Sequence, residues 1–448
     1  MKQCNQMGPH GKCTRSWKRR FGVTKTNCTQ FGLTHVFNVP EQAPNMPHTD
    51  KDEDKDEDGD LTMEDGMTTR SNSQTTGTTP VGSATDMVRD PSRHNDYQQM
   101  YEDGMAYWNG MNFKERDTKR GRLMIEASAS SGFPMAVAYC HYQGWNGMEE
   151  DDKKALAMYV KIEQETNGYH WAQFMLGVCC CYGDGTDQDY TKAVEWLTKA
   201  SVQGNSSAMN NLAVCWKNGH GCAQDYTKAV EWYTKASAQG NSSAMNNLAV
   251  CWMNGHGCAQ DYTKAVEWYT KASAQGNSSA MHNLAVCWKN GHGCAQDYTK
   301  AVEWYTKASA QGNSSAMHNL AVCWKNGHGC AQDYTKAVEW YTKASAQGNS
   351  SAMNNLAVCW MNGHGCAQDY TKAVEWYTKA SAQGNSSAMF NLGVCWMNGR
   401  GCDQNQTTAF EWFQKSAQLG DKDAQDILNS AALSANGNEQ SNSDDELL

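Results

Sequence analysis

The chain has 448 residues, of which 40% are hydrophobic and 19% are charged, and its formal net charge is −10. Residues 50–65 carry ten Asp or Glu against two Lys, whereas residues 1–40 hold seven Lys or Arg and no acid. No run of 18 apolar residues occurs, and the repeated part of the chain shows no basic stripe. Composition therefore argues against a membrane-spanning helix and against a nucleic-acid partner.

The first 96 residues differ in composition from the rest of the chain. Six of the seven Pro lie before Tyr97, and no apolar pattern recurs there. We therefore predict a disordered N-terminal region over residues 1–96, with a basic start and an acidic tract. The basic start is too polar for a secretory signal, so we expect a cytoplasmic protein. A nuclear location stays open because of Lys18-Arg19-Arg20.

The acidic tract Asp54–Asp65 has the spacing of an EF-hand calcium loop, with Gly59 at position 6 and Leu61 at position 8. Position 12 is Asp rather than the usual Glu, and three Pro between residues 40 and 47 disfavour an entering helix. A calcium site and a solvated acidic tract both remain open, and no other cofactor is indicated. The candidate calcium ligands are Asp54, Asp56, Asp58, Asp60 and Asp65.

Most of the remaining chain is a repeat. A run that begins at Ala208 returns nearly unchanged at Ala244, Ala280, Ala316 and Ala352, which sets a period of 36 residues. Looser copies extend the register in both directions, so we predict nine units between Met100 and Asp423. Residues 424–435 read as a final capping helix that completes a domain over residues 97–435. An acidic, disordered tail is expected over residues 436–448.

Each unit is predicted to contain two helices, here named A and B. In helix A the residues Ala208, Leu212, Cys215 and Trp216 share one face, and Asn218-Gly219 ends the helix. Before helix A, the recurring Asn205-Ser206-Ser207 is a glycosylation sequon whose simpler interpretation is a turn in which Ser caps the helix.

Helix B begins after Asp225, a predicted N-cap, and ends at Gln239-Gly240. Its apolar face holds Ala229, Trp232, Tyr233 and Ala236, while Glu231 and Lys235 form an i, i+4 pair on the outside. One hairpin cannot bury both of its faces, so neighbouring units must stack.

This pattern resembles the Sel-one-like repeat family, a relative of the tetratricopeptide repeat. The residues that carry the resemblance in one unit are Ala208, Leu212, Ala213, Trp216, Gly219, Gly221, Cys222, Asp225, Lys228, Ala229, Trp232, Tyr233, Lys235, Ala236 and Gly240. The resemblance implies an all-α solenoid, a right-handed superhelix that serves as a scaffold or adaptor in protein complexes. We therefore expect a protein or peptide partner and no enzymatic activity. The alternative is a calcium- or metal-binding protein in which the array is a spacer.

The recurring Cys and His residues allow chemical interpretations. Six units pair two Cys seven residues apart, as in Cys215 and Cys222. Buried free thiols that pack as small hydrophobes are favoured over a disulfide within each unit, and over metal binding by these two Cys with His220. His220, Cys222 and Asp225 each recur in at least five units, whereas an active site normally occurs once.

The five most similar units vary at two positions of helix A, seven residues apart and on one face. In tetratricopeptide-like arrays the corresponding face lines the concave groove, so we predict that a partner binds there. Drift at exposed positions after duplication would leave the same pattern. The candidate contact residues are Asn210, Val214, Lys217, Asn246, Met253, His282, Lys289, His318, Lys325, Asn354, Met361, Phe390 and Met397.

Overall fold

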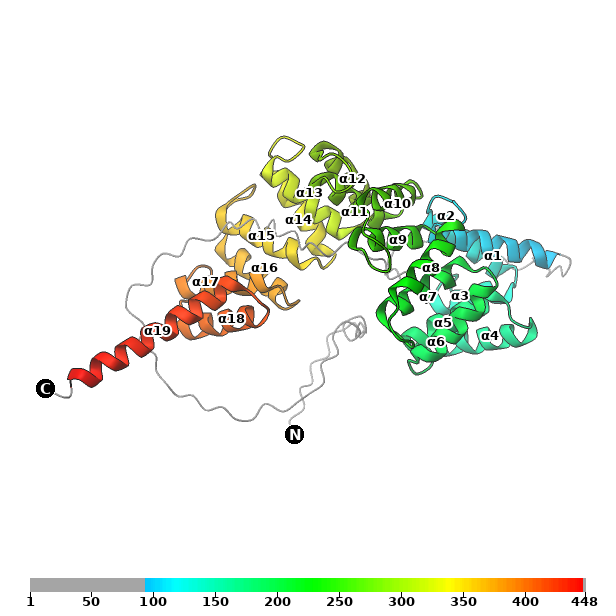
Figure 1. Ribbon diagram of the computed structural model, residues 1–448, viewed down its shortest axis with the longest axis horizontal. Helices are drawn as coiled ribbons and strands as arrows, with labels where there is room; N and C mark the ends of the chain where they lie inside the picture. Colours follow the sequence, from blue (N-terminus) through cyan, green and yellow to red (C-terminus); the bar gives the residue numbers. More distant parts are fainter. Residues whose placement is uncertain (1–92, 446–448) are drawn as a thin grey trace. The chain divides into compact units, whose positions relative to one another are not determined.

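The computed structural model describes residues 93–445, with side chains through Leu433. All regular secondary structure in this range is α-helical, in 19 helices without a strand (Figure 1). The helices pair into consecutive antiparallel hairpins, which confirms the all-α solenoid. The array over residues 93–429 lies within one compact unit.

The A helices alternate with the B helices along the chain. The A helices are α1 (His94–Asn109), α3 (Pro134–Gln143), α5 (His170–Tyr182), α7 (Ser206–Asn218), α9 (Ser242–Asn254), α11 (Ser278–Asn290), α13 (Ser314–Asn326), α15 (Ser350–Asn362) and α17 (Ser386–Asn398). The B helices are α2 (Thr118–Ser130), α4 (Asp152–Glu165), α6 (Tyr190–Val202), α8 (Tyr226–Ala238), α10 (Tyr262–Ala274), α12 (Tyr298–Ala310), α14 (Tyr334–Ala346), α16 (Tyr370–Ser381) and α18 (Gln406–Gln418). The final helix is α19 (Lys422–Asp445), which extends ten residues past the expected end of the cap.

Local sequence signals set the helix ends. The Asp225 carboxylate accepts a hydrogen bond from Lys228 N at 3.0 Å, as an N-cap should, and Gly219 adopts a left-handed φ of 73° after α7. The predicted Ser cap of helix A is wrong. Asn205 is the N-cap, because its side-chain oxygen accepts from Ala208 N at 2.9 Å, and Ser206 is the first helical residue.

The core of each repeat includes the A helix of the next repeat. In one such cluster Tyr305 of α12 packs with Met281 of α11 and Leu320 of α13. The array therefore buries its hydrophobic surface by stacking, as expected for a hairpin too thin to form its own core. At the C-terminal end, Ala424 of α19 packs into the cluster that contains Phe390 and Phe413. This contact confirms that a helix covers the last hairpin.

The outer surface of helix B departs from expectation. Trp232 is only half-buried, and the Lys235 ammonium lies 4.1 Å from the centroid of its ring. The same cation–π contact recurs in six other repeats. Glu231 is exposed and has no ion pair with Lys235 among the described residues. An aromatic ring three residues away offers the ammonium a closer contact than an exposed carboxylate four residues away.

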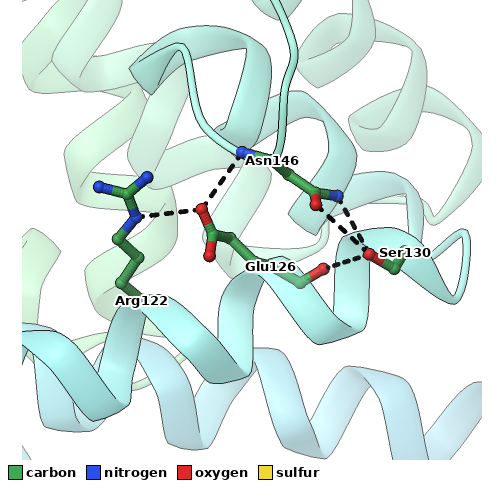
Figure 2. Close-up of polar contacts among 4 residues, drawn as sticks. All are labelled: Arg122, Glu126, Ser130 and Asn146. Carbon is green, nitrogen blue, oxygen red and sulfur yellow. Dashed lines mark hydrogen bonds and ion pairs between the residues drawn. The ribbon is translucent and has the colours of Figure 1, made fainter. Parts of the chain in front are cut away.

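The first two hairpins are joined by a polar contact that the later repeats lack (Figure 2). Glu126 of α2 accepts hydrogen bonds from Arg122 Nε at 3.0 Å and from the backbone N–H of Asn146 at 3.2 Å. Asn146, in the loop after α3, also donates to Ser130 Oγ at 3.1 Å. Asn146 has a left-handed φ of 56°, a conformation that Asn tolerates better than most residues.

Candidate partner-binding surface

The predicted contact residues lie on the A helices α7 to α17, and many of them are buried. The two variable positions are separated by two turns of one helix, as the spacing predicted. The buried members are Asn210, Val214, Asn246, Met253, His282, Met361, Phe390 and Met397. The half-buried members are Lys217, Lys289, His318, Lys325 and Asn354. Only the half-buried group offers surface to a partner without rearrangement.

Contacts between repeats explain part of this burial. Asn247 Nδ2 donates to Asn210 Oδ1 of the preceding A helix at 3.2 Å. Equivalent bonds join Asn283 to Asn246 at 3.0 Å and Asn391 to Asn354 at 3.1 Å. The first variable position therefore helps to register neighbouring A helices. The sequence could not reveal this role, because the bonded residues are 37 positions apart.

The accessible part of this face lies on α11, α13 and α15. There Val286, Val322 and Val358 are half-buried, whereas Val214 and Val250 at the same position are buried. The positive charges of Lys289 and Lys325 lie close enough to His318 to lower the pKa of its ring. This surface joins an apolar strip to positive charge.

The two His residues at the first variable position are neutral at pH 7. Burial lowers the pKa of His282 to about 4, and His318 adds to this shift. Burial, and then Lys289 and Lys325, lower the pKa of His318 to about 4 as well. Each ring also packs on a Tyr of its own repeat, with centroids 5.7 Å apart.

This pair should make the array acid-sensitive between pH 6.5 and 4. Above pH 6.5 both the folded and the unfolded chain hold neutral His, so the full stability is present. Below pH 6.5 these two His residues become protonated in the unfolded chain only. The free energy of unfolding therefore falls as the pH decreases toward their pKa in the folded chain. The loss should approach about 3 kcal/mol for His282 and be smaller for half-buried His318.

The double variant His282→Asn/His318→Asn tests this expectation, because Asn occupies the same position in other repeats, as Asn246 does. Denaturant unfolding at pH 7 and pH 4.5 should show a smaller loss of stability in the variant. The Asp N-caps, whose pKa is lowered mainly by hydrogen bonds from the backbone, are common to both proteins. An unchanged pH dependence would contradict the assignment.

The loop His residues are structural contacts. The His220 ring stacks on Tyr190, the first residue of helix B in the preceding repeat, with centroids 4.6 Å apart. The stack recurs in four further repeats, as in His256 on Tyr226 at 4.8 Å. The five rings are half-buried rather than fully exposed to solvent. Their recurrence is explained by stacking between repeats.

The paired Cys residues are thiols in the structure. Cys258 Sγ lies 3.6 Å from the carbonyl oxygen of Cys251, to which it donates. Burial raises the pKa of the Cys251 thiol to about 12, so the reactive thiolate is disfavoured. No group of three or more His, Cys, Asp or Glu within the described range is placed to hold a metal ion. The candidate calcium ligands Asp54, Asp56, Asp58, Asp60 and Asp65 lie outside the described residues.

The loop between α1 and α2 makes contacts that the sequence did not predict. Gly110 O accepts a hydrogen bond from Ser242 N at 3.1 Å, and Arg116 N donates to Gln275 O at 2.8 Å. Met111 is buried, and its sulfur accepts from Ser207 Oγ at 2.8 Å. The first repeat thus reaches residues far along the array. The sequence did indicate that this loop differs from the others, because it lacks the second Gly found in the loops of the later repeats.

No helix among the described residues is long and apolar enough to cross a membrane. None of the curated proteins searched matches the chain.

Solved structures do match. A Sel1 repeat protein from Oxalobacter formigenes is 28% identical, with a TM-score of 0.50, over 51% of this chain and 94% of that one. A protective antigen of uropathogenic Escherichia coli with an SLR fold is also 28% identical, with a TM-score of 0.44, over 75% and 79% of the two chains.

The Sel1 repeat family itself accounts for most of the array. Its sequence model matches nine consecutive segments, which agree with the nine units expected from the 36-residue register. They are residues 100–133, 135–162, 172–205, 206–241, 242–277, 278–313, 314–349, 350–385 and 386–421. Together they cover more than half of the sequence, and each contains the two helices of one hairpin or most of them. The chain belongs to the Sel1 repeat family.

Proposed function

We propose that the array is a scaffold that binds a protein partner along the A-helix face of α11, α13 and α15. The observation that carries the proposal is the change in burial along otherwise matching repeats. Val214 and Val250 are buried, whereas Val286, Val322 and Val358 at the same position are half-buried. An accessible apolar strip is typical of a protein-binding surface when polar groups flank it.

Charge indicates the kind of partner. Lys289 and Lys325 flank neutral His318, so the face combines two cations with a ring that can donate or accept a hydrogen bond. Acidic and apolar side chains on one segment would complement it. A scaffold is also the simplest role for side chains that recur with the repeat, since His220 and Cys222 are used in stacking and packing.

The double variant Lys289→Glu/Lys325→Glu tests the proposal. Cross-linking followed by mass spectrometry should identify partners of the full chain, and their affinity for the variant should fall about tenfold or more. The matched control is Glu303→Lys/Glu339→Lys, which reverses two exposed charges on the B helices of neighbouring repeats. Circular dichroism should show both variants folded. If the Lys variant keeps every partner at unchanged affinity, the proposal is wrong.

A further inference from the structure

The loop Gly110–Arg116 lies across three successive repeat junctions. A junction is the place where helix B of one repeat ends in Gln-Gly and helix A of the next begins at Ser. Met111 contacts Ser207 at the start of α7, Gly110 contacts Ser242 at the start of α9, and Arg116 contacts Gln275 at the end of α10. The loop is thus a short ligand held by the array itself, and its own Lys114 N–H closes a turn by donating to Met111 O at 3.0 Å.

Backbone groups make two of these contacts. The first N–H groups of an α-helix have no partner within the helix, and Ser242 N satisfies this need by donating to Gly110 O. One repeat later, Gln275 O accepts from Arg116 N. The junctions therefore recognise an acceptor and a donor six residues apart, largely without regard to side chains.

At the middle junction a glycine lets the ligand approach closely. A methyl group on Gly240 would lie 2.4 Å from Phe113 N and 2.8 Å from its ring. Both Asn112 and Phe113 have left-handed φ values, 54° and 57°, so the segment is bent to follow the junctions. Gly240 and Gly276 are buried.

The same junction recurs, uncovered, later in the array. Gly312, Gly348 and Gly384 are exposed, and a methyl group on any of them would meet nothing within 4 Å. The helices that follow begin at Ser314, Ser350 and Ser386, with the same Gly-Asn-Ser-Ser sequence as at Gly240. Identical residues thus hold the loop at one place and stand open at another.

We propose that the junctions at Gly312, Gly348 and Gly384 bind a short turn-forming peptide segment of a partner protein in the way that the earlier junctions bind Gly110–Arg116. This segment offers a carbonyl to Ser N–H, an aromatic ring to the junction glycine, and an N–H to the Gln carbonyl one repeat further on. The proposal rests on the scaffold function and specifies its binding mode. Because the contacts are mainly to backbone, the segment is recognised by its bent backbone and its aromatic residue.

The test uses the full chain and a fluorescent peptide with the sequence of residues 109–117. The receptor variant Ser314→Pro/Ser350→Pro removes two N–H donors at the first helical position, where Pro is tolerated. The preceding Asn313 and Asn349 have ψ of 109°, which suits a residue before Pro. Ser314→Ala/Ser350→Ala is the matched control that keeps both donors.

The peptide should bind the parent chain and the Ala variant equally, and the Pro variant about three- to tenfold more weakly. Replacing Phe113 of the peptide with Ala should also weaken binding. A photoreactive group at the Phe113 position should cross-link to residues 311–315, 347–351 or 383–387, which surround the three junction glycines. Absence of binding at millimolar peptide, equal affinity for the Pro and Ala variants, or cross-links confined to other residues would each overturn the proposal.

The two proposals can fail separately. The peptide carries no net charge and binds at the junctions, so Lys289→Glu/Lys325→Glu should leave its affinity unchanged. If partner binding depends on these lysines while the peptide does not bind, the scaffold function stands and the proposed peptide-binding mode is wrong. If the peptide binds as expected and Lys289→Glu/Lys325→Glu leaves the affinity for partner proteins unchanged, the A-helix face is not the partner site.

Discussion

Gly329→Ala should destabilise the array by more than about 4 kcal/mol, whereas Gly312→Ala should cost only about 1–2 kcal/mol. Both glycines have a left-handed φ, 72° and 87°, so both substitutions carry the same conformational penalty. They differ in surroundings. A methyl group on Gly329 would lie 2.2 Å from the carbonyl oxygen of Tyr298, while one on Gly312 would meet nothing within 4 Å.

The clash cannot be relieved by a side-chain rotation, since the contacted atoms are backbone at the start of α12. Either the loop or the first turn of α12 must move, and that separates His328 from its stacking partner Tyr298. Denaturant unfolding followed by circular dichroism gives the two stability losses, and limited proteolysis shows whether cleavage appears near residue 329. Equal losses for the two variants would show that φ strain alone makes this Gly necessary.

Tyr269→Ala should cost about 3–5 kcal/mol, while Tyr269→Phe should be neutral or stabilising. The ring is fully buried between α9 and α11, where it packs with Met245 and Leu284. Removing it leaves a cavity that flanking helices cannot close without shifting. The hydroxyl oxygen is buried and has no hydrogen-bond partner within residues 93–433, so its removal relieves a desolvation penalty.

Other repeats of the array already have a residue without a hydroxyl at this position. Phe413 and Leu197 stand at the position of Tyr269 in other repeats, and both are fully buried. Burial also raises the pKa of Tyr269 well above its usual value, which favours the neutral phenol. Thermal unfolding of the two variants beside the parent chain is the measurement. A marked loss on Tyr269→Phe would mean that the hydroxyl makes a contact important to the fold.

Much of the fold could be predicted because its causes are local and repeated. Asp225 and Gly219 mark helix ends through backbone groups within a few residues, so a single unit contains the signal. The 36-residue period then predicts stacking, because a two-helix hairpin exposes an apolar face that only the next copy can cover. Ala229, Tyr233 and Ala236 are fully buried, as that pattern required.

The candidate site was only partly predictable. The variable positions of helix A do share one face, but sequence alone could not separate a partner contact from a contact between repeats. Asn210 and Asn246 proved to bond to the following A helix, while His318 and Lys325 remain half-buried. Helical periodicity gives the direction of a side chain and not the distance to the neighbouring helix, which sets its burial.

By itself, the sequence determined the family, the nine hairpins, the helix ends marked by Asp and Gly, and most of the core, since each of these follows from residues within one unit or from its repetition. Only the tertiary structure decided which identical surfaces are covered. Gly240 and Gly348 lie in the same sequence context, yet the first is buried under Phe113 and the second is exposed. The difference arises from a loop 127 residues earlier in the chain, whose reach depends on the rotation between successive repeats. That rotation is a property of packed interfaces and is not contained in any one unit.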